Sequence, residues 1–185
     1  MTICEASPLL LPGADATLRR HLLRYDQTYD QSFWEVHVRL NSHGAATKAD
    51  LSALIFWKHI QNARWMVRLL TTPDTEVRAA TANAFLPDLS DAQRLDALSG
   101  LPGFRSRMAM STVILAAFDP TRFGVYDKLA HSVWSDVASS ECSCTFEQMP
   151  EYFEHLRMAS QELSEGGEVW TPRMVDMALF KLGGG

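Results

Sequence analysis

Apolar residues recur every three or four positions along this 185-residue chain, and no stretch shows the apolar–polar alternation of a half-buried strand. The spacing is clearest over 14–40, where large side chains recur at Leu18, Leu22, Tyr25, Tyr29, Phe33 and His37. We therefore expect one helix from Ala14 to Leu40, ended by the turn-forming residues 41–44. A chain with this period throughout is expected to fold as an all-α protein.

Capping signals mark the starts of further helices, because Ser, Thr and Asp side chains accept hydrogen bonds from the free amides of a first turn. These signals are Thr47 for a helical region to about Leu70, Asp74 for a helix to Phe85, Ser90 with Gln93 for 91–98, Thr145 with Gln148 for a helix to about Leu163, and Thr171 with Pro172 for the last helix. Without a linker or repeat between them, these helices predict a single compact multi-helix domain over 1–185.

Composition narrows the class of protein. Apolar residues make up 46% and charged residues 21%, as in ordinary soluble globular proteins. We expect a cytoplasmic protein, because no apolar run reaches the roughly 20 residues that cross a bilayer and no basic region precedes an N-terminal apolar run. The net charge of −5 argues against a strong nonspecific nucleic-acid binder, although it leaves room for a local basic patch.

The segment between two expected helices carries the most specific pattern in the chain. A helix over 91–98 leads into Leu101-Pro102-Gly103, and a helix of small residues begins near Ser106 and stops before Pro120. A tight turn of this kind directs backbone N–H groups and the positive end of the second helix toward one anion. Such a turn uses glycine where φ is positive or where a phosphate must approach the backbone closely, because glycine has no β-carbon.

This stretch resembles the helix-hairpin-helix element, here about 91–118, of the helix-hairpin-helix DNA glycosylase superfamily. Leu101 to Phe104 match the start of the family's L-P-G-apolar-G pattern, while Arg105 replaces the second glycine. A looser similarity extends to little-studied bacterial members without an assigned activity. The resemblance implies DNA contacts at Leu101, Pro102, Gly103, Phe104, Arg105, Ser106 and Arg107.

Asp127 follows the hairpin at about the distance of the family's catalytic aspartate, after the apolar segment 123–126. The resemblance implies that its carboxylate assists hydrolysis of an N-glycosidic bond, by stabilising a cationic sugar or preparing a water. Asp127 is equally suited to cap a helix over 128–136, and both interpretations stay open. Bifunctional members carry a nucleophilic lysine where this chain has Arg107, which stays protonated. We therefore expect a monofunctional enzyme without lyase activity.

Four further residues are candidates for a substrate pocket or for DNA contact: Trp57, Lys58, Tyr126 and Lys128. The first two belong to a segment that interleaves aromatic and basic residues, namely Phe56, Trp57, Lys58, His59, Arg64, Trp65 and Arg68. Such a face can stack bases and contact phosphates. The competing interpretation is that the aromatic rings lie in the core and the basic groups in solvent.

The sequence gives no support for a metal or cofactor. Cys142 and Cys144 form a C-x-C pair that His131 or His155 could complete, but two close ligands without a second pair are weak evidence. Three cysteines cannot supply the four ligands of an iron–sulfur loop that some glycosylases carry.

Two hypotheses remain: a monofunctional DNA glycosylase-like enzyme, or a non-catalytic module that binds DNA or protein. A base-sized pocket beside Asp127 would favour the enzyme, whereas a filled core there would favour the module.

Overall fold

The computed structural model describes residues 8–58, 63–105, 108–140 and 145–185, and its regular elements are all helical. The α-helices are α1 (Ala14–Leu22), α2 (Gln31–His43), α3 (Lys48–Trp57), α4 (Ala63–Thr71), α5 (Asp74–Ala84), α6 (Asp91–Ser99), α7 (Met108–Phe118), α8 (Lys128–Ser132), α9 (Met149–Ser164) and α10 (Pro172–Leu182). Short 3₁₀ turns are η1 (Gln27–Asp30), η2 (Trp134–Asp136) and η3 (Phe146–Gln148). Over the described ranges the extended pairing amounts to one antiparallel bridge, Leu10 with Ala138. The expected all-α class is confirmed.

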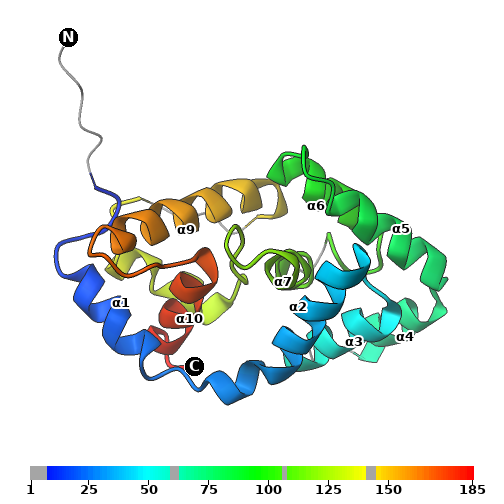
Figure 1. Ribbon diagram of the computed structural model, residues 1–185, viewed down its shortest axis with the longest axis horizontal. Coiled ribbons are helices and arrows are strands. Elements are labelled where there is room, and N and C mark those ends of the chain that lie inside the picture. Colours follow the sequence, from blue (N-terminus) through cyan, green and yellow to red (C-terminus); the bar gives the residue numbers. More distant parts are fainter. Residues whose placement is uncertain (1–7, 59–62, 106–107, 141–144) are drawn as a thin grey trace, which may run out of the picture.

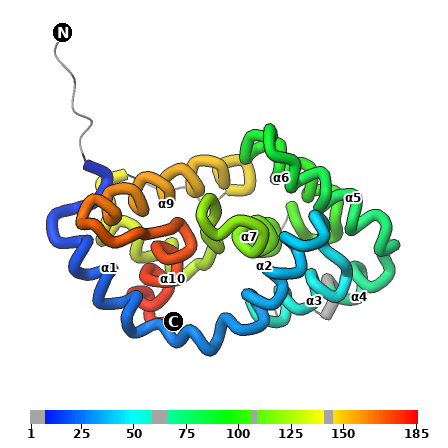
Figure 2. The backbone as a smooth tube through the Cα atoms, in the orientation of Figure 1, coloured from blue at the N-terminus to red at the C-terminus, as the bar shows by residue number. Residues whose placement is uncertain are grey.

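The chain crosses the molecule and returns. α1, α9 and α10 lie at one end, α3 to α6 at the other, and α2 runs along the edge that links them (Figure 1). The tube view shows α7 between the two ends, where the chain turns back (Figure 2). The first helix packs on the last, so the N-terminal and C-terminal segments share one end of the molecule.

α7 is the centre of the hydrophobic core. Consecutive residues on all its faces are buried: Met110, Ser111, Thr112, Val113, Ile114, Leu115, Ala116 and Ala117. A helix that is apolar all round must be surrounded by other elements, and the small side chains allow those elements to approach closely. The segment that follows α7 therefore starts from a fixed position in the core.

Three of the predicted helix starts are confirmed at atomic detail. The amide of Asp50 donates to Thr47 Oγ1 at 3.1 Å, and the amide of Thr47 donates to Asp50 Oδ2 at 2.9 Å, which completes a capping box. Ser90 and Gln93 form the same reciprocal pair at the start of α6. Thr171 accepts from the amide of Met174 at 3.2 Å, directly before Pro172.

The single helix expected over 14–40 is wrong. α1 ends at Leu22, a turn follows, and the chain passes through η1 before α2 begins at Gln31. The Asp26 carboxylate accepts from the amide and the hydroxyl of Thr28, at 3.0 and 2.7 Å. This local pairing competes with the continuous helical ladder and starts a new turn.

Two other expected caps act differently from the prediction. Pro73 occupies the N-cap of α5, and Asp74 instead accepts from the amide of Lys48 at 2.8 Å, so it satisfies the start of α3. Thr145 makes no side-chain cap, and η3 precedes α9, which begins at Met149. Pro150 stands in the first turn of α9, where its missing N–H has no intrahelical partner to lose.

Within the described ranges, every helix is too short or too polar to cross a bilayer.

Candidate active site

The turn between α6 and α7 is closed by its own backbone. Gly103 has φ +90°, a conformation that favours glycine, and the amide of Phe104 donates to the carbonyl of Leu101 at 3.1 Å. The side chains of Leu101 and Phe104 are buried, and the Ser111 hydroxyl donates to the Phe104 carbonyl at 2.7 Å. Because these side chains face the core, this part of the turn can offer a ligand mainly its backbone.

Arg105 stands where the family pattern has its second glycine. Its side chain is 68% exposed, lies 3.5 Å from the equally exposed Glu147, and has its guanidinium 5.9 Å from the centre of the Phe146 ring. The turn is thus in contact with the segment that leads into α9. Ser106 and Arg107, the remaining predicted hairpin contacts, lie outside the described residues.

A pocket of about 180 Å³ lies beside Asp127. Its lining comes from four separate stretches of chain: Tyr25, Tyr29, Trp57, Lys58, Val125, Asp127, Arg173, Asp176 and Phe180. An adjoining hollow of about 360 Å³ shares Tyr25, Tyr29 and Phe180, so these three rings stand at the boundary between the two. The volume beside Asp127 is below the roughly 300–1,000 Å³ of pockets that enclose drug-sized ligands, so it has room for a small group.

The Asp127 carboxylate divides its two oxygens between two partners. Oδ1 accepts from the amide of Leu129 at 2.7 Å, which caps α8, and Oδ2 is paired with Lys58 Nζ. The Asp127 and Lys58 side chains are 20% and 13% exposed, respectively. The two interpretations of Asp127, as a helix cap and as a pocket residue, are therefore compatible in one geometry.

Trp57 forms part of the inner wall. Its ring packs against Phe33 with centroids 5.0 Å apart, and its Nε1 donates to Asp30 Oδ1 at 3.1 Å. Tyr29 lies 5.8 Å from the same ring and donates its hydroxyl to the Trp57 carbonyl at 2.7 Å. The end of α3 is thus fixed against η1 and α2, and it carries Lys58 to the pocket.

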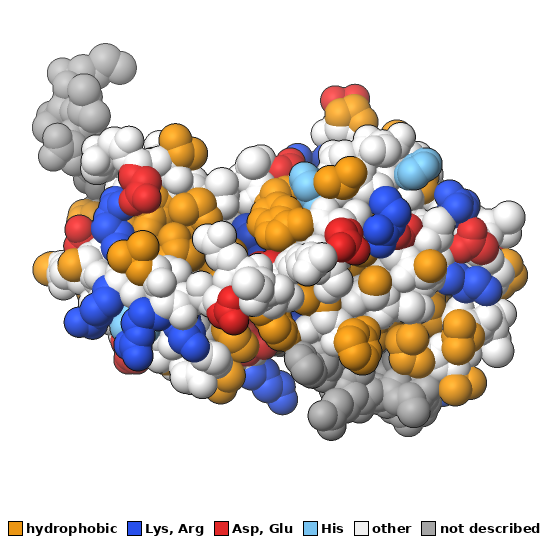
Figure 3. Space-filling view, turned by 60° about the horizontal axis from the view of Figure 1, so that its bottom comes forward, with side chains coloured by type: hydrophobic (Ala, Val, Ile, Leu, Met, Phe, Trp, Pro, Cys, Tyr) orange, Lys and Arg blue, Asp and Glu red, His pale blue; other side chains and the backbone are white. Residues whose placement is uncertain are grey.

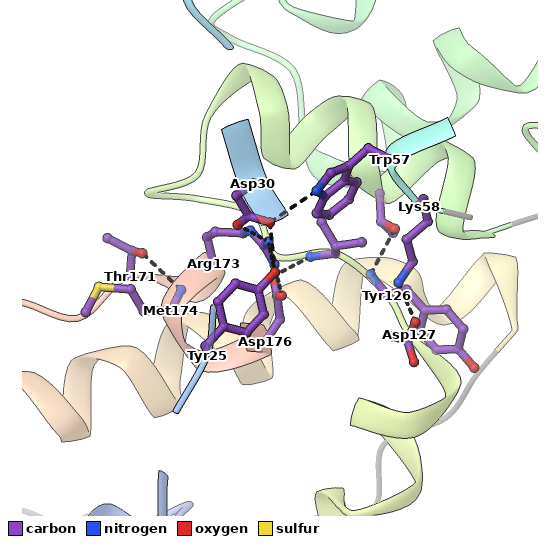
Figure 4. A network of polar contacts seen from close by, with 12 residues as sticks. Tyr25, Asp30, Trp57, Lys58, Tyr126, Asp127, Thr171, Arg173, Met174 and Asp176 are labelled. Carbon is purple, nitrogen blue, oxygen red and sulfur yellow. Dashed lines mark hydrogen bonds and ion pairs between the residues drawn. The ribbon is translucent and has the colours of Figure 1, made fainter. Parts of the chain in front are cut away.

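Behind the pocket, Arg173 is buried between two carboxylates (Figure 4). Nη2 donates to Asp30 Oδ2 at 2.6 Å and to the Tyr25 hydroxyl at 3.3 Å, while Nη1 is paired with Asp176. Burial opposes the charge of the guanidinium, but the carboxylates of Asp176 and Asp30 outweigh it and hold the pKa of Arg173 above its usual range. This ion network joins α10 to η1 across the pocket.

Asp176 connects that network to the segment that carries Asp127. Its Oδ2 accepts from the amide of Val125 at 2.6 Å, two residues before Asp127. Gly124 permits this approach, because a β-carbon there would lie 2.8 Å from Asp176 Oδ2 and 2.5 Å from Leu156 Cδ1. Burial raises the pKa of Asp176 to about 7, against the opposing effects of Arg173 and the Val125 amide.

Of the four further candidates, the structure brings Trp57 and Lys58 to Asp127 but leaves the other two apart. Tyr126 is buried, packs edge-on against Tyr152 at 5.7 Å and does not line the pocket. Its amide donates to Thr112 Oγ1 on α7 at 2.9 Å. Lys128 is exposed and also stands outside the lining. His59 and the side chains of Arg64 and Trp65 lie outside the described residues.

Sequence reasoning missed the polar groups that form the back of the pocket, namely Tyr25, Asp30, Arg173 and Asp176. One signal was available: Arg173 and Asp176 stand three residues apart in a helix whose other residues, apart from Lys181 in the last turn, are apolar. Charged residues on one helix face that is otherwise buried need partners, because an unpaired charge in the interior is strongly unfavourable. That spacing could have identified a buried ion pair, although not its distant partner Asp30.

Basic groups are not concentrated in one broad stripe on the face shown in Figure 3. Lys and Arg side chains gather toward the end formed by α1 and are otherwise mixed with Asp and Glu. Among the described residues, no three His, Cys, Asp or Glu side chains are arranged to hold a metal ion, and Cys142 and Cys144 lie outside those residues.

No known family model, curated protein or solved structure matches this chain.

Proposed function

We propose that this protein binds DNA through a helix-hairpin-helix element and hydrolyses the N-glycosidic bond of an extruded nucleotide with the help of Asp127. The observation that carries the proposal is a carboxylate at the wall of a small pocket lined by four aromatic rings. Base removal requires both parts, a slot that accepts a planar base and a negative charge beside the sugar that becomes cationic.

The aromatic lining suits the base. The rings of Tyr25, Tyr29, Trp57 and Phe180 offer apolar faces for stacking, and the first two also carry hydroxyl groups that can contact polar edges. An extruded base leaves stacking and pairing partners behind in the duplex, so replacement contacts of this kind must compensate for their loss.

Asp127 supplies the electrostatic part of the reaction. With Oδ1 held by the amide of Leu129, the carboxylate has a fixed orientation, and Oδ2 is available to the pocket when Lys58 shifts. A preorganised negative charge stabilises an oxocarbenium-like sugar, and it can also orient the attacking water. In this proposal Asp127 acts on the sugar while the aromatic rings hold the base.

The hairpin supplies nonspecific attachment to the backbone of DNA. Gly103 allows a turn whose amides can face a phosphate, and α7 begins three residues beyond Arg105. With a net charge of −5, few phosphates can be neutralised, so the proposal predicts modest affinity with a shallow salt dependence.

A second candidate function is a non-catalytic module that binds DNA or protein. Its support is the pairing of Arg105 with Glu147, which offsets a basic charge at the turn. The pocket beside Asp127 favours the enzyme, because a pure binding module does not need a carboxylate and a lysine facing a cavity.

The test is a base-release assay on duplexes that carry uracil, alkylated bases or oxidised bases, with abasic sites revealed by alkali. Release that disappears in Asp127→Asn, while duplex binding persists, supports the proposed hydrolase. Duplex binding without release of any base in this panel favours the module.

A further inference from the structure

A second cavity, of about 370 Å³, lies against α10. Its apolar walls are formed by Leu22, Trp34, Pro120, Met174 and Met177. Among the described residues, its lining and that of the pocket beside Asp127 have Arg173 alone in common. The volume falls within the roughly 300–1,000 Å³ of cavities that enclose small molecules. The cavity is therefore a separate candidate binding site.

α10 presents different side chains to the two cavities. Asp176 and Phe180 line the pocket beside Asp127, whereas Met174 and Met177 line the second cavity. Residues three or four apart share one face of a helix, so each pair forms a continuous wall. Methionine side chains are unbranched and flexible, and they adapt to the shape of the group that they contact. The second cavity thus has a wall that suits a small apolar body.

Arg173 lies between the two cavities and keeps one N–H group without an acceptor. In Figure 4, Thr171 and Met174 lie on one side of Arg173, and Tyr25 and Asp176 lie on the other. The Arg173 side chain is 4% exposed, and its buried Nε has no hydrogen-bond partner. A buried donor without a partner is unfavourable, so a group that accepts from Nε would gain a hydrogen bond to a charged donor.

The planar guanidinium of Arg173 fixes the direction of this donor. Nε–H and one N–H of Nη2 point along the same edge of the group. Nη2 donates to Asp30 Oδ2 at 2.6 Å, so Nε–H is directed to the same side, toward the junction of η1 and α2. That junction contributes Gln27 and Trp34 to the lining of the second cavity. The unpaired donor is therefore directed toward the second cavity.

We propose that the second cavity binds a small neutral molecule with a flat apolar body and a carbonyl oxygen that accepts from Arg173 Nε. An arginine nitrogen can only donate, so the ligand must supply the acceptor. A carboxylate ligand is disfavoured, because Arg173 already lies between the carboxylates of Asp30 and Asp176. The Trp34 ring, 39% exposed, offers a surface on which a flat group can pack. Binding there requires no DNA and no substrate beside Asp127.

The test is a titration of the whole protein with acetophenone, a benzene ring that carries one carbonyl group, followed by nuclear magnetic resonance. Isotopically labelled methionine methyl groups report on the walls, and the labelled Nε–H group of Arg173 reports on the hydrogen bond. We expect saturable shifts at Met174, Met177 and Arg173 Nε–H. Met110 on α7 and Met158 on α9 do not line the cavity, so their signals should not move.

Two comparisons isolate the hydrogen bond and the cavity. Ethylbenzene is close to acetophenone in shape but lacks the oxygen, so it should bind about tenfold more weakly or worse. Met174→Trp fills the cavity with a larger ring and should abolish the shift at Met177. Met158→Trp makes the same substitution at an exposed position on α9 and should leave that shift unchanged. Circular dichroism establishes whether both variants are folded.

The outcomes are distinct. Saturable shifts at the three cavity groups that Met174→Trp removes, together with weaker binding of ethylbenzene, support the proposal. No shifts, equal binding of the two probes, or shifts confined to the control methionines overturn it. Shifts at the Trp57 indole in their place also overturn it, because they locate the probe beside Asp127. The comparison of the two probes uses wild-type protein, so it decides the question even where Met174→Trp does not fold.

Discussion

The hairpin turn and the pocket beside Asp127 are built in opposite ways. The turn is the contiguous segment 100–105. It is closed by the hydrogen bond from the Phe104 amide to the Leu101 carbonyl, and Gly103 has a positive φ. The pocket joins four stretches of the chain, and its lining residues extend from Tyr25 to Phe180 in the sequence. The turn can therefore be recognised as a motif, whereas the pocket exists only after the whole chain has folded.

The energetic character of the two regions differs as well. At the turn, the Arg105–Glu147 pair is about two-thirds exposed on both sides, and such pairs contribute about 0–1 kcal/mol. At the pocket, Arg173 and Asp30 are 4% and 0% exposed, so loss of either partner leaves a buried charge uncompensated. Changes at the pocket are expected to have large effects, and changes at the turn small ones.

The largest effect is expected for Asp127→Asn. The variant should lose base release by about 100-fold or more, in the range of general acid–base contributions. Asparagine can still accept from the amide of Leu129, so the cap of α8 and the fold should persist. The measurement is single-turnover base release, with the exposed Asp136 changed to Asn as the control. Undiminished release would remove Asp127 from the reaction centre.

A large loss of stability is expected for Arg173→Ala. Removing the guanidinium leaves Asp30 and Asp176 buried together, so the free energy of unfolding should fall by about 3–5 kcal/mol. Urea titration followed by circular dichroism measures it. Arg78→Ala breaks a pair that is 46% and 40% exposed and should change stability by less than about 1 kcal/mol. Equal effects of the two substitutions would contradict the proposed contrast between buried and exposed pairs.

The pH dependence of stability should reveal Asp176. Its pKa rises from 3.8 to about 7 on folding, because burial disfavours the charged form. The folded state thus binds the additional proton between these values, and the stabilisation is complete below about pH 4 and lost as the pH rises through about 7. Wild-type protein should therefore lose stability relative to Asp176→Asn across that interval, as measured by urea midpoints in a pH series. Parallel curves would show that Asp176 does not titrate in this range.

The smallest effect is expected at the turn, for Gly103→Ala. A β-carbon at φ +90° is strained, so stability should fall by about 1 kcal/mol, with weaker binding to duplex DNA. Gly100→Ala is the matched control, because Gly100 has φ −69° and a β-carbon added there would meet open space. Fluorescence anisotropy with labelled duplex measures both variants. Wild-type affinity in Gly103→Ala would exclude the turn from the DNA interface.

The successful parts of the sequence analysis concern hydrogen bonds between near neighbours. Thr47, Ser90 and Thr171 cap helices as predicted, because each accepts from an amide three residues ahead. The prediction of a single helix over 14–40 is wrong at the point where the local cap Asp26 and the distant partner Arg173 act together. Asp26 starts a new turn there, and that turn directs Asp30 toward Arg173, which is 143 residues away.

The candidate site shows the same division between contacts that depend on near neighbours in the sequence and contacts that depend on distant residues. Asp127 was a candidate from the family resemblance, and Trp57 and Lys58 were candidates from the aromatic and basic residues around them, but the position of all three at one pocket was not predicted. Tyr126 and Lys128, adjacent to Asp127 in sequence, do not line that pocket, because α7 holds the first in the core and the second faces solvent. Neighbours along a chain that enters a helix point in different directions, so proximity in sequence is a poor guide to a shared cavity.

The sequence by itself determined the all-helical class, three of the capped helix starts and a turn that requires glycine at position 103, because these depend on interactions within a few residues. Tertiary structure alone decided which charged groups are buried together and that Lys58 faces Asp127. Those pairings depend on the angles and distances between whole helices, which are set by packing around α7 rather than by any local pattern.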